Sequence, residues 1–149
     1  MVQYTSQWHS QCLPFLSLEE AERVLAAMES VQLEAGTTLY RCDEPADRFY
    51  VLVSGRIAVQ KGTGFGERMQ VVALLDPGAP IGESALLPGQ VRGATLAAVQ
   101  ASTLLALSAE SFTALCVADA PLAVKLLTWV VGRMAQRLKK SSERLAHVL

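Results

Sequence analysis

The sequence predicts an α+β fold in which helices flank a jelly-roll-like set of short strands. Three observations support this prediction. Residues 31–107 consist of short apolar stretches separated by Gly, Pro and Asp, which is typical of antiparallel strands and turns. Helix-start signals stand on either side of this region, at Ser17 and at Ser108. From about Ala120 onward, apolar residues recur at helical spacing.

The bulk composition indicates one globular domain in the cytoplasm. The chain has 149 residues, 51% of them hydrophobic, which is enough for one core. A net charge of −1 gives no electrostatic reason to expect nucleic acid or an anionic membrane as a partner. Met1–Ser17 lacks the pattern of a signal peptide, and Leu122–Val131 is about half the length of a membrane span. The scattered Cys12, Cys42 and Cys116 lack metal-type spacing and fit a reducing compartment.

The individual elements follow from local signals. Ser17 and the two acids that follow Leu18 predict a helix that continues to about Ser30, with Leu18 among its apolar anchors. Ser108 predicts a helix that ends near Ala118. Seven stretches between these helices have the residue types of strands. They are Val31–Glu34, Thr38–Arg41, Arg48–Val53, Ile57–Lys61, Met69–Leu75, Ala94–Gln100 and Thr103–Leu107.

The run Ile81–Thr95 carries the strongest functional signal. Gly82 allows close approach of the backbone to a ligand, and the short helix predicted over Glu83–Leu87 begins with free N–H groups. Arg92 offers a planar, permanently charged group for phosphate oxygens. Glu83 only accepts hydrogen bonds, so beside a phosphate it suits a sugar hydroxyl. A phosphate and a sugar held together imply a nucleotide.

This run resembles the phosphate-binding cassette of cyclic nucleotide-binding domains. These domains occur in protein kinase A regulatory subunits, gated channels and the bacterial catabolite activator protein. Gly36, Gly55 and Gly78 stand where that family places glycines in turns, and the resemblance covers roughly Leu13–Val148. It implies a β-roll with flanking helices and a long C-terminal dimer helix.

The sequence departs from the family pattern at three positions. Cys42 and Ala79 stand where the family usually has Gly and Asp, and Ile81 replaces a common Phe. None of these changes removes a group that contacts the ligand. The resemblance therefore implies one domain over residues 1–149, made of a helical segment (1–30), a β-roll (31–107, cassette 81–95) and C-terminal helices (108–149).

The resemblance also implies the ligand and its contacts. Cyclic AMP is the expected ligand, with its ribose hydroxyl at Glu83 and its cyclic phosphate at Arg92. Guanine-selective relatives tend to carry threonine directly after the arginine, where this chain has Gly93, so adenine is favoured. The base is expected between Val72 and the last helix. The expected binding residues are Val72, Gly82, Glu83, Ser84, Ala85, Arg92, Gly93, Ala94, Ser141 and Ser142.

The last segment has a heptad pattern. Its apolar positions span about 40 Å at 1.5 Å per residue, longer than one small barrel covers. This length favours a parallel homodimer through residues 120–149 over an ordinary amphipathic helix. Ser141 interrupts the pattern, either to fix the register or, as in the similar helix of the catabolite activator protein, to contact adenine together with a hydroxyl of the partner subunit. The seam positions are Val124, Leu127, Val131, Met134, Leu138, Ser141, Leu145 and Val148.

No catalytic arrangement emerges from the sequence. His9 and His147 lie outside the strand region, and no nucleophile with a base or pair of carboxylates is evident. Gly62–Gly66 lacks the spacing of a phosphate loop and is interpreted as a hairpin tip. The basic residues of 133–144 are interpreted as a solvated face, and we expect no DNA-binding domain in this chain. We therefore expect a non-enzymatic receptor without a cofactor or metal.

Two other classes stay open. In the first class, the roll is a vestigial scaffold that binds no nucleotide, and the long helix binds a protein partner. A redox or cluster sensor on the same fold is the second, although three isolated cysteines disfavour it.

Overall fold

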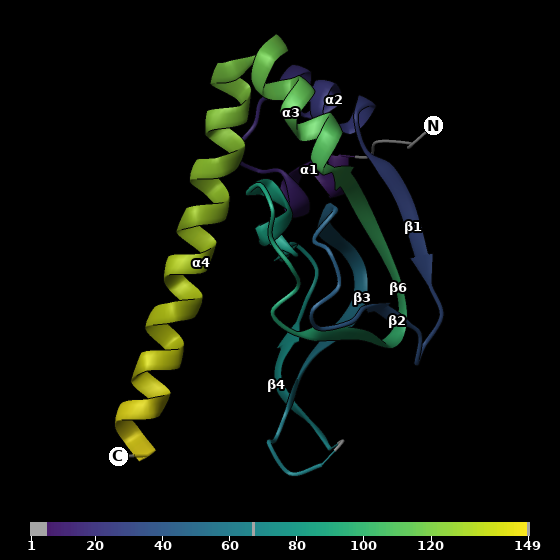
Figure 1. The fold of residues 1–149 in the computed structure, drawn as a ribbon. Coiled ribbons are helices and arrows are strands. Elements are labelled where there is room, and N and C mark those ends of the chain that lie inside the picture. The colour runs from purple at the N-terminus through teal and green to yellow at the C-terminus, as the bar shows by residue number, and fades with distance from the viewer. Residues whose placement is uncertain (1–5, 67, 149) are drawn as a thin grey trace.

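The computed structural model describes residues 6–66 and 68–148 and shows an antiparallel β-roll with helices at one end and along one side (Figure 1). The α+β architecture predicted from the sequence is confirmed. In chain order the elements are α1 (Ser6–Cys12), α2 (Leu18–Ala26), β1 (Glu29–Leu33), β2 (Thr38–Tyr40), β3 (Arg48–Gly62), β4 (Met69–Leu75), β5 (Pro80–Ile81), the 3₁₀ turn η1 (Glu83–Leu86), β6 (Thr95–Ser108), α3 (Ala109–Ala118) and α4 (Ala120–Val148).

The sheet is organised around its two long strands. Its order is β1-β6-β3-β4, while β2 pairs with β6 and β5 pairs with β3, all antiparallel. One cluster of buried side chains, which includes Leu52 and Leu104, fills the roll. A second cluster, which includes Phe49 and Leu126, lies where the helices cover the end of the roll. The sheet therefore contributes to both cores, and its strands fix the helices relative to the roll.

Four predicted strands merge into two continuous ones. Gly55 lies inside β3 at a φ of 101°, where β3 shifts its register against β6. A Cβ atom at Gly55 would lie 2.6 Å from the carbonyl oxygen of Ala101, so glycine permits a bend that leaves the strand unbroken. The predicted strands Arg48–Val53 and Ile57–Lys61 form β3, and Ala94–Gln100 and Thr103–Leu107 form β6.

The predicted bounds of the remaining elements are mostly confirmed, with one correction at α2. The helix ends at Ala26 and not near Ser30, because Glu29 already pairs with Ala106 of β6. Leu18 is 54% exposed, so its prediction as an apolar anchor is wrong. No local signal in the sequence predicts α1, although Cys12 at its end is fully buried.

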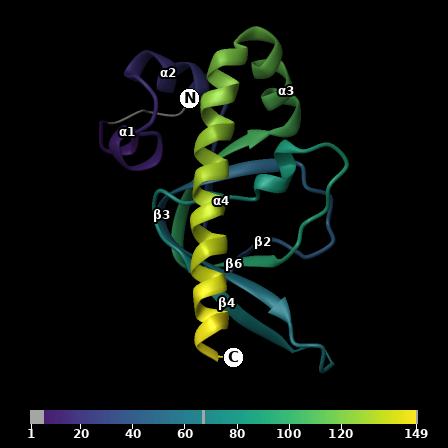
Figure 2. The same ribbon diagram turned by 90° about the vertical axis from the view of Figure 1, so that its left-hand side faces the viewer.

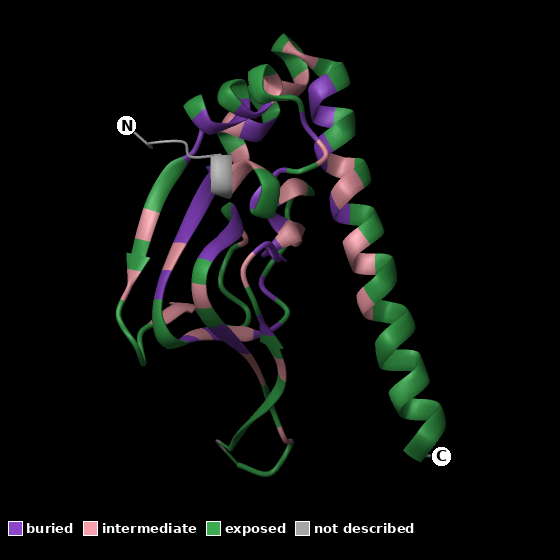
Figure 3. Ribbon diagram, turned by 180° about the vertical axis from the view of Figure 1, so that it is seen from behind, coloured by how far each residue is buried: buried purple, intermediate pink, exposed green. Residues whose placement is uncertain are grey.

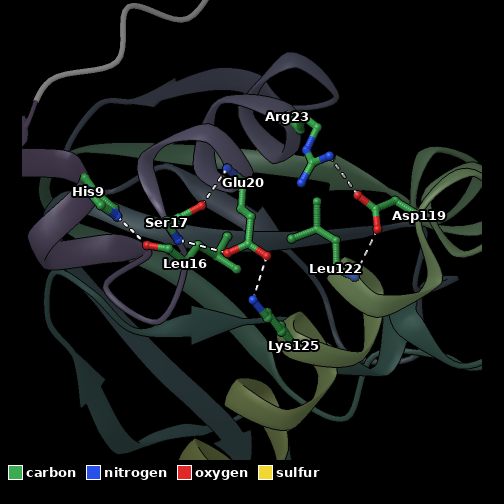
Figure 4. Close-up of polar contacts among 8 residues, drawn as sticks. All are labelled: His9, Leu16, Ser17, Glu20, Arg23, Asp119, Leu122 and Lys125. Atoms are coloured by element: carbon green, nitrogen blue, oxygen red, sulfur yellow. Dashed lines mark hydrogen bonds and ion pairs between the residues drawn. The ribbon is translucent and has the colours of Figure 1, made fainter.

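Two ion pairs connect α2 to the start of α4 and to the residue directly before it (Figure 4). The ammonium group of Lys125 donates to the carboxylate of Glu20 at 2.7 Å. Arg23 of α2 lies 3.3 Å from the carboxylate of Asp119, directly before α4. The stacked rings of Phe15 and Trp129, with centroids 4.8 Å apart, extend this contact. The base of α4 is therefore held by the helical end of the molecule.

The second half of α4 leaves the body of the protein. Val130 is the last buried residue of the helix, and every residue from 138 to 148 is exposed (Figure 3). Within the described ranges, none of the helices combines the length and the apolar character that crossing a membrane requires.

Glu20→Gln tests the attachment of α4. The hydrogen bond from Lys125, followed by that from the backbone of Ser17, lowers the pKa of Glu20 from 4.5 to about 2. Because the folded-state pKa lies below the ordinary value, the carboxylate stabilises the fold above pH 4.5, and this contribution is lost as the pH falls toward 2. We expect a lower thermal midpoint for Glu20→Gln than for the parent above pH 4.5, and equal midpoints below about pH 2.

Glutamine retains the capping interaction with Ser17, so the variant mainly removes the charge. Glu19→Gln, on the same helical turn, is the control and is expected to behave like the parent. If the difference in thermal midpoint between Glu20→Gln and the parent stayed constant as the pH fell from 4.5 to 2, the ion pair would not contribute to the attachment of α4.

Candidate functional site

A cavity of about 240 Å³ opens where the chain passes from β5 through η1 toward β6. Strands β2, β3 and β4 and helix α4 complete its walls. The lining residues are Tyr40, Val59, Lys61, Leu75, Ile81, Gly82, Glu83, Ser84, Arg92, Gly93, Ala94, Leu96 and Arg137.

Gly82 adopts a conformation that only glycine tolerates well. Its φ is 71°, in the left-handed region, and its carbonyl accepts the amide of Ala85 at the start of η1. A Cβ atom here would lie 2.6 Å from Nη1 of Arg92 and 3.2 Å from the carbonyl oxygen of Arg48. The missing side chain therefore leaves room for the guanidinium beside the backbone.

Arg92 is a buried cation whose ion pair with Asp47 is long and mostly exposed. The residue is 2% exposed. Its Nη2 donates to the carbonyl of Arg48 at 2.8 Å, and its Nη1 donates to the carbonyl of Gly82 at 3.3 Å. The carboxylate of Asp47 lies 3.5 Å from Nη2 but is 73% exposed. Its Nε is buried and has no hydrogen-bond partner in the described part of the chain. The carbonyls satisfy donors of Arg92 but do not neutralise its charge.

Tyr40 lies against this cation and is not among the binding residues expected from the sequence. The guanidinium carbon of Arg92 is 4.0 Å from the centroid of the Tyr40 ring. Burial raises the pKa of Tyr40 to about 12 and also raises that of Tyr50, whose ring stacks on Tyr40. Both hydroxyls are therefore protonated at neutral pH. Nothing in the strand pattern of Thr38–Arg41 distinguishes Tyr40 from an ordinary core aromatic.

Most of the expected binding residues lie together on this cavity. Glu83 is half-buried, and its carboxylate accepts no hydrogen bond from residues 6–66 or 68–148. Ala85 is buried and does not line the cavity. The expected residues on the wall are Gly82, Glu83, Ser84, Arg92, Gly93 and Ala94.

The expected base contacts lie in an adjoining groove. Val72 of β4 and Ser141 of α4 both line a groove of about 450 Å³. Leu75 and Arg137 line both the groove and the cavity, so the two spaces adjoin. Ser142 lines neither of them.

Two arginines of α4 contact the chain just before the cassette. Arg137 donates to the carbonyl of Pro80 at 2.8 Å, and Arg133 donates to the carbonyl of Gly78 at 3.2 Å. Burial lowers the pKa of Arg137. The interpretation of this basic segment as a solvated face is therefore wrong for these two residues. Figure 2 shows α4 running across one side of the roll.

The lining of the cavity has the residue types of an anion site. Over the two described ranges, no group of three or more His, Cys, Asp or Glu side chains is placed to hold a metal ion. The cavity contains the cations Arg92, Arg137 and Lys61 but a single carboxylate, that of Glu83. A small anion with hydroxyl groups matches this arrangement.

Comparisons with known proteins agree with this chemistry. The family model described as the cyclic nucleotide-binding domain matches residues 30–119. The cAMP-dependent protein kinase regulatory subunit of Dictyostelium discoideum is 33% identical over 103 residues, which are 66% of this chain and 32% of the relative. The chain thus spans about one third of that protein.

Solved structures share the fold over nearly the whole chain. A cyclic nucleotide-binding domain from Methylobacillus flagellatus superposes with a TM-score of 0.84 at 22% identity, covering 96% of this chain and 80% of that one. The catabolite activator protein of Thermus thermophilus gives a TM-score of 0.73 at 26% identity, covering 96% of this chain and 63% of that one.

A pair of glycine variants distinguishes two effects on stability: the steric clash of a side chain at the site and the strain of a non-glycine residue at positive φ. They are Gly82→Ala and Gly89→Ala. Both glycines have positive φ, 71° and 67°, but a Cβ at Gly89 meets nothing within 4 Å. We expect each variant to lose about 1–2 kcal/mol of unfolding free energy from its backbone conformation. Gly82→Ala is expected to lose about 1–3 kcal/mol more, because its methyl group displaces Arg92. Urea denaturation measures both losses, and equal losses would contradict the packing at Gly82.

Proposed function

Because this chain belongs to the cyclic nucleotide-binding domain family, we propose that it is a non-enzymatic receptor for cyclic AMP. The observation that carries the proposal is the buried guanidinium of Arg92 on the cavity wall. A buried charge costs several kcal/mol unless an opposite charge is close, and Asp47 lies at 3.5 Å and mostly in solvent. A phosphate in the cavity adds a negative charge that is more sheltered from solvent than that of Asp47.

The neighbouring carboxylate favours a phosphate that carries a sugar. Glu83 lies on the same cavity wall as Arg92, so a bare phosphate there meets a negative charge as well as a positive one. A ribose hydroxyl removes this conflict, because it donates to the carboxylate while the phosphate pairs with the guanidinium. A nucleotide whose phosphate is closed onto its own ribose keeps both groups within the short distance that one cavity allows.

The adjoining groove suits the base. Its walls at Val72 and Leu75 are apolar, and the hydroxyl of Ser141 is able both to donate to and to accept from a purine edge. Gly93, on the cavity wall, has no hydroxyl that would favour guanine. We therefore assign adenine to the groove, with Ser142 available to a second subunit.

The exposed face of α4 supports a homodimer. Val124, Val131, Leu138 and Leu145 are each more than half exposed and recur every seven residues. The helix does not bury these side chains on its own domain, so the alternative of an ordinary amphipathic helix leaves them without a partner. A second copy of α4, packed in parallel, covers the whole row.

The contacts of α4 suggest how binding is transmitted. Arg133 and Arg137 join the helix to the segment that enters the cassette, and Arg137 also lines the cavity. If a nucleotide binds more tightly to the protein when α4 is in one of two positions, binding shifts the population of molecules toward that position. The relative from Dictyostelium is a regulatory subunit, and we assign a regulatory role in the cytoplasm to this chain as well.

Calorimetric titration with cyclic AMP, cyclic GMP and AMP tests the receptor function. We expect the parent to prefer cyclic AMP and Arg92→Ala to bind it about 30-fold to several thousand-fold more weakly, because the phosphate loses its buried charge partner. Arg41→Ala, which changes an exposed arginine next to Tyr40, is the control and should bind like the parent. Arg92→Lys keeps a charge in place if the alanine variant fails to fold.

Each contrary result has a definite meaning. Undiminished binding by Arg92→Ala would show that the site is elsewhere. A folded parent that binds none of the three nucleotides would favour the scaffold alternative. Equal binding of cyclic GMP would remove only the preference for adenine.

Sedimentation equilibrium of Leu138→Lys tests the dimer. We expect the parent to dimerise and the variant to be monomeric, because two lysines would meet at the centre of the apolar row. Val117→Lys changes an apolar residue on α3 that is even more exposed than Leu138, and this control should remain dimeric. Cyclic AMP is expected to change the dimer dissociation constant of the parent. An unchanged constant would refute transmission through α4.

A further inference from the structure

We propose that Tyr40 is a positioning residue whose ring fixes the plane of the Arg92 guanidinium and so sets the direction in which Arg92 meets the phosphate. This inference rests on the proposed function for its binding readout. It concerns a residue of β2, which lies far from the cassette in the sequence.

Hydrogen bonds reach only the two terminal nitrogens of the guanidinium. The carbonyls of Gly82 and Arg48 accept from them at 3.3 and 2.8 Å, and the mostly exposed carboxylate of Asp47 accepts from Nη2 at 3.5 Å. Because Nε has no hydrogen-bond partner in the described part of the chain, these bonds restrain a tilt of the plane least at the Nε end. The Tyr40 ring, 4.0 Å from the guanidinium carbon, covers one face and opposes this tilt. The unpartnered Nε is therefore held in one orientation.

The ring is itself held in place. Tyr40 pairs with Leu96 of β6, four residues after Arg92, so the two strands fix the ring and the cation relative to each other. The ring of Tyr50 from β3 stacks on Tyr40 with centroids 6.4 Å apart and an angle of 25° between the planes. Burial keeps the Tyr40 hydroxyl neutral, with a pKa of about 12, so the contact is that of a cation with an aromatic face.

Two substitutions separate the ring from the hydroxyl. Tyr40→Leu removes the aromatic face, and Tyr40→Phe removes only the hydroxyl. By calorimetry we expect Tyr40→Leu to bind cyclic AMP about 5- to 30-fold more weakly than the parent, and Tyr40→Phe to bind within about threefold of it. A loss of similar size in both variants would indicate a hydroxyl contact with the ligand and overturn the positioning role.

Combining Tyr40→Leu with Arg92→Lys distinguishes a positioning role of Tyr40 from a general contribution to packing. Lysine has a compact charge with no plane to orient, so the ring has little to position in Arg92→Lys. We expect Tyr40→Leu to weaken binding by less than about twofold in that background. If the loss is equally large in both backgrounds, Tyr40 supports the fold only and the proposal is wrong.

A measurement without nucleotide tests the same contact independently. The Nε–H signal of Arg92 is assigned in nitrogen-15 NMR spectra by its absence from Arg92→Lys. We expect it to be protected from solvent exchange in the parent and in Tyr40→Phe, and to lose that protection in Tyr40→Leu. Retained protection in Tyr40→Leu would overturn the proposal. If the parent bound no nucleotide, the receptor function would fail, while this experiment would still decide what Tyr40 does.

Discussion

The buried positive charge of Arg92 is the constraint around which this site is built. The protein supplies backbone carbonyls from Gly82 and Arg48, the face of Tyr40 and, at 3.5 Å, the carboxylate of Asp47, which is 73% exposed. These groups keep the guanidinium folded into the roll but compensate its charge only in part, because solvent screens the exposed Asp47. The space next to it is therefore favourable for an anion. Glycine at position 82 is required because any side chain there would occupy the place of the guanidinium.

The same short segment connects the site to the rest of the fold. Gly78 and Pro80, just before the cassette, accept hydrogen bonds from Arg133 and Arg137 of α4. Gly78 is also packed against the N-terminal helix, because a Cβ atom there would lie 2.8 Å from the carbonyl oxygen of Gln11. A change in the path of this segment therefore affects α1, α4 and the cavity together. This arrangement gives a physical route by which an occupied site can alter the position of a helix.

The sequence predicted the parts of the site that lie close together in the chain. Gly82, Glu83 and Arg92 belong to one run, whose residue types and spacing are specific. Tyr40 and Arg137 reach the same cavity from β2 and α4, and only the strand pairing and the packing of α4 bring them there. Two element boundaries were also predicted wrongly, because they depend on pairing between strands that are distant in the sequence. The bend at Gly55 resembles a strand end, and the pairing of β1 with β6 ends α2 earlier than its own sequence requires.

The free half of α4 connects the proposed ligand with the proposed dimer. The groove assigned to the base has α4 as its outer wall, yet the helix is exposed from residue 138 onward and makes its polar contacts with the roll through Arg133 and Arg137. A single subunit therefore offers the base a wall that is fixed at one end only. A partner helix along the exposed apolar row would hold that wall and bring a second Ser142 toward the groove. Because nucleotide and partner would each restrict the same half of α4, each is expected to strengthen the binding of the other.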